Sequence, residues 1–284
     1  MRQSAYLVAR AQTSIICFSL SPHHLNMNPT PALATFPSLR GQRVFITGGA
    51  TGIGAAMVEA FAQQGAHVAF VDIAEAEATA LAERLAALSY PPVWWRTCDV
   101  RDIPALQNVI AQAQSELGDF FTLVNNVASD DRHALEAVTL DYYDERMAVN
   151  QRPAFFSIQA LVPGMRRLGG GSIINLGSTG WQGKGTGYIC YSVAKSSVNG
   201  LTRSLADTLG ADRIRINTVS PGWVMTERQM RLWLNAEGEA AIARNQCLPD
   251  KLQPSDIARM VLFLASADGA MCTAQEFKVD AGWD

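Results

Sequence analysis

Short apolar runs alternate with longer amphipathic stretches along most of the chain. The runs Arg43–Gly48 and His67–Asp72 are too short for stable helices, and most of their positions are apolar. This is typical of strands in a parallel sheet that is buried on both faces. The same pattern predicts further strands at 93–97, 121–125, 172–176, 214–219 and 276–279, and helices at 52–64, 75–88, 102–117, 139–168, 189–210 and 254–267.

Strands that alternate with helices throughout predict one α/β domain. We expect a Rossmann-type, doubly wound parallel sheet of about seven strands, with helices on both faces, over residues 37–284. No linker, repeat or low-complexity segment interrupts the chain after residue 40. Residues 223–250 are less regular and follow the sixth strand, where a mobile lid over a pocket would lie.

The first part of the chain differs in charge from the rest. No acidic residue precedes Glu59, so residues 1–58 carry a formal charge of +4, whereas the whole chain carries −3. The apolar run Ile15–Phe18 is too short for a signal peptide and lacks a clear cleavage site. We therefore expect residues 1–36 to be a disordered extension, and residues 1–26, which precede Met27, to be dispensable for folding and activity.

The composition argues against several classes of function. No stripe of basic residues suggests a nucleic-acid partner, and no apolar run approaches the ~18 residues that a membrane helix needs. The five cysteines are widely spaced and form no C-x-x-C pair, so we expect neither a disulfide framework nor a metal site. We expect a cytoplasmic protein with reduced thiols.

A glycine-rich turn between the first strand and the first helix predicts a dinucleotide site. In Thr47–Gly54 (TGGATGIG) the glycines let the backbone turn tightly and approach a pyrophosphate, which rests on the helix N-terminus. Asp72 ends the second strand, where an acid accepts hydrogen bonds from the adenosine ribose and repels a 2′-phosphate. Since no arginine follows Asp72 directly, we expect NAD as the cofactor, with NADP less favoured.

Tyr191 and Lys195 stand four residues apart in a segment with helical periodicity. Such residues share one face of a helix, so the ammonium can lie beside the phenol. A cation about 4 Å away, at an effective dielectric near 20, supplies the roughly 4 kcal/mol that lowers a tyrosine pKa by about three units. The pair therefore predicts a phenolate that takes a proton from an alcohol. Without its context, such a spacing would more often be an exposed pair of little energetic value.

The context resembles the short-chain dehydrogenase/reductase family over about residues 38–284. The shared motifs are the glycine turn, Asp72, Asp99, Asn125-Asn126, Asn150, Ser178, Tyr191, Lys195 and the segment Pro221–Thr226. The resemblance implies a catalytic tetrad in which Ser178 binds the reacting oxygen and Tyr191 takes its proton. In the same tetrad Lys195 holds the nicotinamide ribose and lowers the tyrosine pKa, and Asn150 fixes a water that leads protons out.

The resemblance also implies which residues hold the cofactor. Asp99 and Val100 would line the adenine, and Asn126 would lie by a cofactor ribose. The segment after the sixth strand would hold the nicotinamide amide. The full set implied is Gly48, Thr51, Gly52, Ile53, Gly54, Asp72, Ile73, Asp99, Val100, Asn126, Tyr191, Lys195, Pro221, Val224 and Thr226.

Two motifs depart from the family pattern. The usual Asn-Asn-Ala-Gly is Asn125-Asn126-Val127-Ala128, and the usual Asp-Gly-Gly near the C-terminus is Asp280-Ala281-Gly282. The Ala128 methyl stands where the backbone usually passes close to the nicotinamide, which puts a tight cofactor fit in question. Neither departure removes a catalytic group.

Two polar segments should border the substrate: residues 129–133 (SDDRH) and residues 179–184 (TGWQGK), which includes Lys184. Outside this fold the first would read as a solvated charge run, and its single histidine argues against a metal site. Within it, the two tryptophans can cover a sugar face while polar groups pair its hydroxyls, although both are as compatible with a role in the core or at an interface. The expected substrate contacts are Asp130, Ser178, Trp181, Gln182, Tyr191 and Trp223.

A closer resemblance, to bacterial short-chain aldose 1-dehydrogenases such as D-xylose and L-arabinose 1-dehydrogenases, lies in residues 126–133, 143–146, 162–165 and 279–283. It implies NAD-dependent oxidation of a pentose or 6-deoxyhexose at the anomeric carbon to the aldonolactone. Two alternatives stay open. One is an NAD(P)-dependent reductase of ketone or 3-oxoacyl substrates, and the other is a non-catalytic nucleotide sensor, a kind of relative that commonly loses the tyrosine or the lysine.

The family resemblance implies a homotetramer, with helix pairs and the C-terminal segment at the interfaces. The apolar stretch Met260–Leu264 is compatible with such an interface. Beside a small-molecule sugar, we expect no nucleic-acid or membrane partner.

Overall fold

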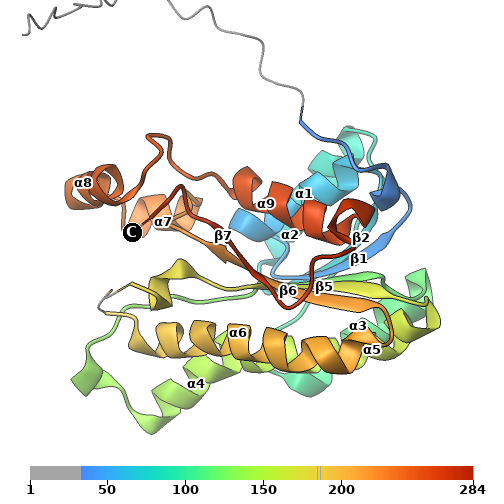
Figure 1. The fold of residues 1–284 in the computed structure, drawn as a ribbon, viewed down its shortest axis with the longest axis horizontal. Helices are drawn as coiled ribbons and strands as arrows, with labels where there is room; N and C mark the ends of the chain where they lie inside the picture. Colours follow the sequence, from blue (N-terminus) through green and yellow to red (C-terminus); the bar gives the residue numbers. More distant parts are fainter. Residues whose placement is uncertain (1–32, 184, 186, 284) are drawn as a thin grey trace, which may run out of the picture. The chain divides into compact units, whose positions relative to one another are not determined.

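The computed structural model describes residues 33–183, 185 and 187–283. From Thr35 onward these residues form one compact unit (Figure 1). Most of the expected extension, residues 1–32, and Lys184 of the second polar segment lie outside the described residues. The expectations about residues 1–36 and about Met27 therefore stay predictions.

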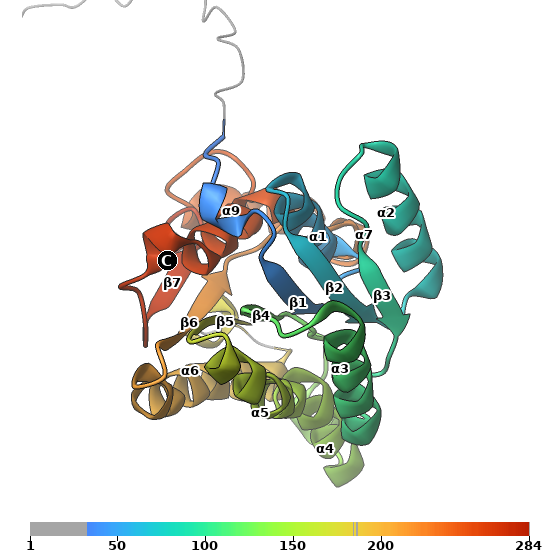
Figure 2. The ribbon, with the colours of Figure 1, turned by 90° about the vertical axis from the view of Figure 1, so that its right-hand side faces the viewer.

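Seven parallel strands form one sheet within the described residues, as the sequence predicts. They are β1 (Arg43–Thr47), β2 (His67–Asp72), β3 (Trp94–Thr97), β4 (Thr122–Asn125), β5 (Gly171–Leu176), β6 (Ile214–Pro221) and β7 (Glu276–Val279). Their order is β3-β2-β1-β4-β5-β6-β7, and every neighbouring pair is parallel. The strand order reverses between β1 and β4 (Figure 2), which is where doubly wound sheets open a crevice at the carboxyl ends of their strands.

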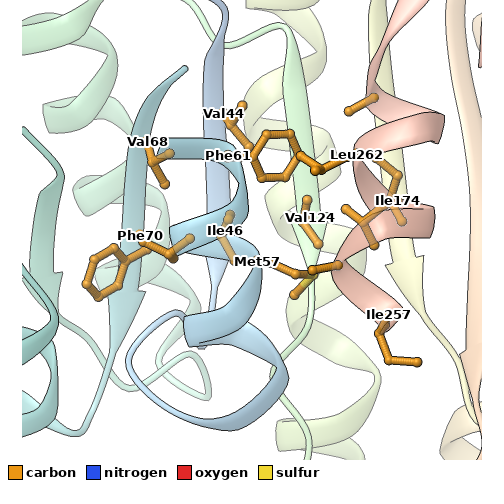
Figure 3. Packing of buried hydrophobic residues seen from close by; sticks show 14 of the residues in the cluster. Val44, Ile46, Met57, Phe61, Val68, Phe70, Val124, Ile174, Ile257 and Leu262 are labelled. Carbon is orange, nitrogen blue, oxygen red and sulfur yellow. The ribbon is translucent and has the colours of Figure 1, made fainter. Parts of the chain in front are cut away.

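Helices cover both faces of the sheet (Figures 1 and 2). One face carries α1 (Gly52–Gln63), α2 (Glu75–Ala87) and α9 (Pro254–Ala265), and the other carries α3 (Ile103–Leu117), α4 (Leu140–Asn150), α5 (Arg152–Arg167) and α6 (Ile189–Gly210). In β1, Val44 and Ile46 pack toward α1 (Figure 3). Phe45 packs toward the opposite layer. Burial on both faces explains why these strands are apolar at nearly every position.

A line of buried polar side chains crosses β4, β5 and β6. Asn125 donates to Asn175 at 2.8 Å, Asn175 donates to Thr202 of α6 at 3.0 Å, and the hydroxyls of Thr202 and Thr218 are 2.8 Å apart. Ser157 of α5 donates to Asn125 at 2.5 Å. Because buried polar groups must keep their partners, this line holds α5 and α6 at one position against the sheet.

The predicted helix over 139–168 is instead two helices. α4 ends at Asn150 and α5 begins at Arg152, with Gln151 between them at φ −128° and ψ −53°. Pro153 lies in the first turn of α5, where its missing N–H does no harm. In one continuous helix it would lose the hydrogen bond to the carbonyl of Val149, and its ring would clash with that carbonyl. The expectation of a single helix was therefore wrong.

Two other stretches differ from expectation. Residues 223–250, expected to be less regular, contain the short helices α7 (Glu227–Leu232) and α8 (Ala236–Asn245). The stretch Met260–Leu264 belongs to α9, which packs on α1, and its residues Val261, Leu262 and Leu264 are buried. Its apolar character therefore reflects the core of the domain and gives no support to a subunit interface.

Ala281 has a left-handed backbone conformation, with φ at +57°. Its carbonyl oxygen accepts the N–H groups of Cys247 at 3.0 Å and Leu248 at 3.1 Å, which connect the C-terminal segment to the end of α8. A left-handed φ favours glycine because any side chain there is crowded by the backbone. The departure from Asp-Gly-Gly thus places strain at this turn.

Replacing Ala281 with glycine should relieve this strain. Ala281→Gly is expected to raise the free energy of unfolding by about 1 kcal/mol, measured by chemical denaturation at pH 7. Ala270→Gly is the matched control, because Ala270 is exposed and has φ at −56°. There the same change should lower stability by roughly 0.4–1 kcal/mol. Equal losses at the two positions would contradict strain at Ala281.

Candidate active site

The predicted site residues gather at the carboxyl edge of the sheet. Asp72 ends β2, Asn126 follows β4 and Ser178 follows β5. Tyr191 and Lys195 lie in the first two turns of α6. The structure thus brings together residues that are far apart in the sequence, beside the reversal of strand order between β1 and β4.

The turn between β1 and α1 contains close approaches that only glycine allows. Gly48 and Gly52 have φ at +72° and +54°. A Cβ on Gly54 would overlap the carbonyl oxygen of Gly48, and one on Gly52 would lie 3.2 Å from Cγ2 of Thr226. Thr51, at the N-cap of α1, makes no side-chain capping bond within the described residues. A helix N-terminus that follows a glycine-rich turn and has no side-chain cap among the described residues fits a cofactor pyrophosphate.

Two side chains attach this turn to neighbouring strands. The Asp72 carboxylate accepts the N–H groups of Ala50 at 2.8 Å and Ala74 at 3.0 Å. Nδ2 of Asn126 donates to the carbonyl of Gly48 at 2.8 Å. Asp72 and Asn126 therefore shape the turn in addition to standing where a ribose is expected.

Three further expected cofactor residues follow β2 and β3. The Asp99 carboxylate accepts the backbone N–H of Arg101 at 3.0 Å and its guanidinium at 2.9 Å, and these bonds lower the pKa of Asp99. Val100 is buried, whereas Ile73 is 69% exposed. Asp99 is thus an anion held by its neighbour, and Ile73 offers an apolar side chain at the open edge.

The segment from Pro221 to Thr226 leads from β6 into α7. The Pro221 carbonyl accepts the Thr179 hydroxyl at 3.2 Å, and Val224 is buried. Oγ1 of Thr226 accepts the N–H of Gln229 at 3.2 Å and so caps α7. Because its methyl group lies against the Gly52 position, the segment borders the glycine turn, as expected for a nicotinamide site.

Ser178, Tyr191 and Lys195 form one group. The Ser178 side chain lowers the pKa of the Tyr191 phenol, and its oxygen accepts the N–H of Gly180 at 3.1 Å. Lys195 is buried, and its Nζ donates to the Leu176 carbonyl at 2.6 Å. Nζ lies 5.9 Å from the centroid of the Tyr191 ring. The geometry places a hydroxyl, a phenol and a cation together, a set that can move a proton from an alcohol.

The pKa of Tyr191 shifts in the direction opposite to the expectation. Burial raises the pKa of Tyr191 to about 12; Ser178 lowers it, Asp130 raises it further, and Arg132 lowers it slightly. Burial also lowers the pKa of Lys195 to about 8. The expectation placed a cation about 4 Å away, but Lys195 is held by a carbonyl, and the removal of water from the phenolate outweighs its attraction. The protein groups alone therefore keep Tyr191 protonated at neutral pH.

Asn150 holds the loop that follows β4. Its Oδ1 accepts the N–H of Ser129 at 2.8 Å, and its Nδ2 donates to the carbonyls of Ser129 at 3.1 Å and Arg146 at 3.0 Å. Asn150 and Lys195 also line a cavity of about 10 Å³. Such a volume holds about one water molecule, so the lining fits the expected water beside Asn150.

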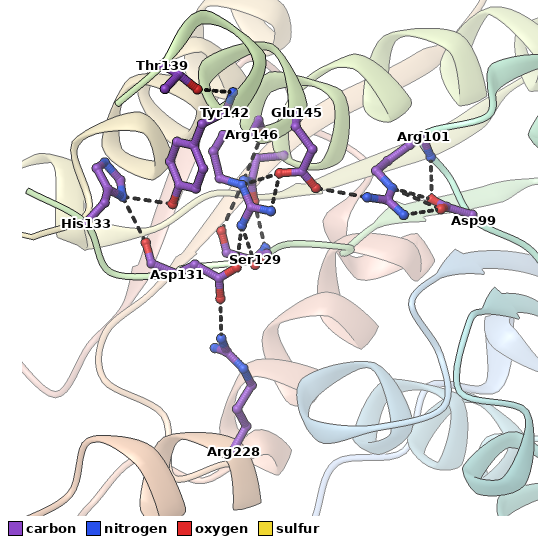
Figure 4. Close-up of polar contacts among 11 residues, drawn as sticks. Asp99, Arg101, Ser129, Asp131, His133, Thr139, Tyr142, Glu145, Arg146 and Arg228 are labelled. Atoms are coloured by element: carbon purple, nitrogen blue, oxygen red, sulfur yellow. Dashed lines mark hydrogen bonds and ion pairs between the residues drawn. The ribbon is translucent and has the colours of Figure 1, made fainter. Parts of the chain in front are cut away.

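Asp130, an expected substrate residue, is held by α7. Arg228 donates to Asp130 and, at 2.8 Å, to Asp131, while Gln229 donates to Asp130 at 2.8 Å. Arg146 of α4 donates to Asp131 at 2.6 Å (Figure 4). Although burial raises the pKa of Asp130, the bonds from Gln229 and Arg228 bring it below its ordinary value. The carboxylates thus join the loop after β4 to both helices.

The other expected substrate residues point in different directions. Gln182 donates to Glu276 of β7 at 2.9 Å, so its amide faces the sheet edge in this arrangement. Trp223 donates to Gln229 at 3.1 Å, and its ring lies edge-on to Trp283 with the centroids 6.3 Å apart. The buried indole N–H of Trp181 has no partner among the described residues. A substrate hydroxyl could accept from it, since buried donors are normally paired.

Sequence reasoning missed that the charge of Arg132 acts on the base and that Trp233 packs against Arg132. The Arg132 guanidinium lies over the rings of Tyr188, at 4.4 Å, and Trp233, at 4.8 Å. The Tyr188 ring is 6.2 Å from that of Tyr191. Both residues stood in segments expected to border a pocket, but no spacing rule joins a loop after β4 to the end of α7.

The described residues contain neither a metal-binding cluster nor a membrane-spanning helix. No group of three or more His, Cys, Asp or Glu side chains there could hold a metal ion. No helix among them is long and apolar enough to cross a membrane.

Comparisons with known proteins agree with this geometry. A family model described as enoyl-(acyl carrier protein) reductase matches residues 48–284. The D-xylose 1-dehydrogenase of Caulobacter vibrioides is 47% identical over 250 residues, which cover 88% of this chain and 98% of that protein. A solved short-chain dehydrogenase/reductase from Serratia marcescens is 32% identical with a TM-score of 0.80, covering 86% of this chain and 98% of that one. The chain belongs to the short-chain dehydrogenase/reductase family.

A further relative of this dehydrogenase/reductase is a Rhizobium meliloti protein named as a probable galactose dehydrogenase. It is 47% identical over 247 residues, covering 87% of this chain and 96% of that protein. Nicotinamide dinucleotides are the cofactors of the family, and the bare glycine turn with its free helix N-terminus fits such a group. The enzyme is thus an oxidoreductase.

The buried Lys195 should make the enzyme less stable than a variant without its charge. One pKa unit equals about 1.4 kcal/mol, so the fall from 10.5 to about 8 corresponds to about 3 kcal/mol of unfavourable burial. Lys195→Met is expected to abolish activity and to raise the free energy of unfolding at pH 7 by roughly 1–3 kcal/mol, since the Leu176 carbonyl loses its donor.

The lowered pKa of Lys195 determines how the stability gain of Lys195→Met depends on pH. Below pH 8 Lys195 is charged in both the folded and the unfolded protein, so the gain in the variant is complete. It should disappear as the pH rises from about 8 to 10.5, where the folded protein has lost the proton and the unfolded chain has not. Lys278→Met, at an exposed position of β7, is the control and should show no such gain. If the difference in free energy of unfolding between Lys195→Met and wild type did not change with pH, burial of the lysine charge would not be its cause.

Proposed function

We propose that this enzyme oxidises a cyclic aldose, a pentose or a 6-deoxyhexose, at the anomeric carbon to the aldonolactone, with NAD as the hydride acceptor. The observation that carries the proposal is 47% identity to two proteins that are both named as sugar dehydrogenases. The surroundings of the base support it. The charges of Asp130 and Arg132 act on the Tyr191 phenol, and the buried indole N–H of Trp181 has no partner among the described residues. A polyhydroxylated substrate offers hydroxyls to such groups, whereas an apolar acyl chain or steroid does not.

Three members of the tetrad act directly on the reacting groups. Ser178 donates a hydrogen bond to the anomeric oxygen, and Tyr191 takes the proton from it, so that the C–O bond becomes the lactone carbonyl. Bound oxidised nicotinamide supplies the acceptor for the hydride and a positive charge that lowers the raised pKa of Tyr191. Lys195 adds a second positive charge beside the phenol. An anomeric hydroxyl is more acidic than an ordinary alcohol, so the phenolate need not be a strong base.

The preference for NAD rests on Asp72. Two backbone N–H groups hold its carboxylate at the end of β2, beside the glycine turn. A fixed negative charge in that place accepts hydrogen bonds from ribose hydroxyls and repels a 2′-phosphate. The adjacent Ile73 side chain, 69% exposed, can lie against the adenosine.

The proposal includes assembly of four copies in the cytoplasm. Large apolar side chains are exposed on α4, α5 and α6, which lie together on one side of the sheet. They are Leu140, Tyr143, Phe155, Ile189 and Val193, between 39% and 74% exposed. Several large exposed apolar groups on neighbouring helices are compatible with a protein interface.

A panel of aldoses tests the central proposal. Purified enzyme is incubated with D-xylose, L-arabinose, D-galactose and a 6-deoxyhexose, each with NAD and with NADP at a fixed enzyme concentration. We expect reduced cofactor and the matching lactone from at least one sugar, with the higher kcat/KM for NAD. No turnover of any aldose would refute the proposal, and reduction of apolar ketones or 3-oxoacyl thioesters by NADPH, without sugar turnover, would establish the alternative.

Removal of the Asp72 charge should change the cofactor preference. Asp72→Ser is expected to raise the ratio of kcat/KM for NADP to that for NAD by about tenfold or more, because about 1.4 kcal/mol of repulsion is removed. Glu75→Gln is the matched control, since Glu75 is exposed in the first turn of α2 and its loss removes the same charge nearby. A wild type that prefers NADP, or an equal effect of both changes, would show that Asp72 does not select the cofactor.

A further inference from the structure

The helix that carries Tyr191 begins without a cap of its own. Tyr188, at the N-cap of α6, makes no side-chain capping bond within the described residues. The first N–H groups of a helix have no acceptor in the helix, and a buried one needs a partner from elsewhere. Cys190 is only 2% exposed, and its N–H donates to Nε2 of His133 at 3.2 Å. His133 therefore caps α6 from the loop after β4.

The contacts of His133 define the tautomer of its neutral ring. Because Nε2 accepts from a backbone N–H, the neutral ring must carry its proton on Nδ1. Nδ1 lies 3.1 Å from the carbonyl oxygen of Asp131 and 3.1 Å from the hydroxyl oxygen of Tyr142 (Figure 4). The two rings meet edge-on, and the His133 N–H donates to the Gly187 carbonyl at 2.7 Å. The imidazole is thus held on both nitrogens and cannot turn without breaking a bond.

His133 joins two parts of the site. Cys190, the residue it binds, directly precedes Tyr191 in the first turn of α6. Asp130 and Arg132, whose charges act on the Tyr191 phenol, precede His133 in the same loop. A shift of the imidazole would therefore move the base and the groups around it relative to each other.

We propose that His133 is a positioning residue. Its Nε2 accepts a hydrogen bond from the first turn of α6 and so fixes the position of the Tyr191 phenol relative to the loop that carries Asp130. The proposal rests on the proposed role of Tyr191 as the base. Misplacement of a reacting group by about 1 Å can slow a reaction by about a hundredfold, so a smaller shift is sufficient for a measurable loss.

Two substitutions of His133 test the hydrogen bonds of its two ring nitrogens one at a time. The side-chain amide of glutamine reaches about as far as Nε2 and can still accept from Cys190, whereas that of asparagine reaches only as far as Nδ1. His133→Asn therefore keeps a donor to Asp131 and loses the bond to α6, and His133→Gln does the reverse. Tyr142→Phe is a further control, because it removes the hydroxyl at Nδ1 and leaves the bond to α6.

The first measurement needs neither cofactor nor substrate. Amide hydrogen exchange of the peptide that contains Cys190, followed by mass spectrometry on the full-length protein, reports the hydrogen bond itself. We expect exchange at least tenfold faster in His133→Asn, and exchange close to wild type in His133→Gln and Tyr142→Phe. Equal protection in His133→Asn and wild type would overturn the proposal.

The second measurement separates positioning from a general structural role. In His133→Asn we expect kcat to fall about tenfold with little change in the KM for NAD. The primary isotope effect with a C1-deuterated aldose should rise, because the chemical step becomes slower. In His133→Gln we expect kcat within about threefold of wild type. Equal losses in the two variants, or a lower kcat with an unchanged isotope effect, would overturn the proposal, since a smaller folded fraction lowers kcat without changing the isotope effect.

A failure of aldose oxidation would be recognised separately. In that case wild type converts none of the sugars, and the same variants are compared on the ketone that it does reduce, with deuterated reduced nicotinamide as the donor. The comparison between asparagine and glutamine then decides the role of His133 whichever substrate is the true one.

Discussion

The position of α6 against the sheet is the constraint on which the rest of the site depends. Three attachments hold this helix, and each uses a buried polar group. Thr202 joins the line from Asn125 through Asn175 to Thr218 near the middle of the helix, and Lys195 donates to the Leu176 carbonyl two turns earlier. At the start of the helix, the N–H of Cys190 donates to the loop after β4. Because an unpaired buried polar group costs about 1–3 kcal/mol, a displaced helix would lose several such bonds together.

The electrostatics of the site are unfavourable in the protein alone. Burial raises the pKa of Tyr191 to about 12 and lowers that of Lys195 to about 8, so both shifts disfavour the charged form that proton transfer uses. Asp130, which Arg228 and Gln229 bind, raises the pKa of Tyr191 further. The fold thus places the Tyr191 phenol without ionising it at neutral pH. A cation bound in the site would lower the pKa of Tyr191 and so favour the phenolate. Function at this site is obtained at some expense of stability, as is common for catalytic groups.

Local signals in the sequence predicted most of the strands and helices. The strands, the bounds of α6 and the glycine turn follow from short-range periodicity and spacing, and the single parallel sheet of about seven strands follows from the alternation of strands and helices. Pro153 was a visible signal for the break between α4 and α5, but the apolar pattern on both sides of it suggested one continuous helix. The direction of the Tyr191 shift could not be predicted, because it depends on how much water the surrounding elements remove. Nor could the partners of Asp130 and Gln182, since Arg228 and Glu276 meet them only after the sheet has formed.

The hydrogen bonds between Asp130, Asp131 and α7 have a consequence for any sugar that enters. A hydroxyl that binds Asp130 joins a carboxylate that already accepts from Arg228 and Gln229, and so competes with these bonds for its charge. The ion pair that Arg228 keeps with Asp131 is open to water, with the two side chains 41% and 48% exposed. Dissolved salt screens such exposed pairs and so changes how firmly α7 holds the loop. The binding of a ligand without any charge would in this way become sensitive to ionic strength.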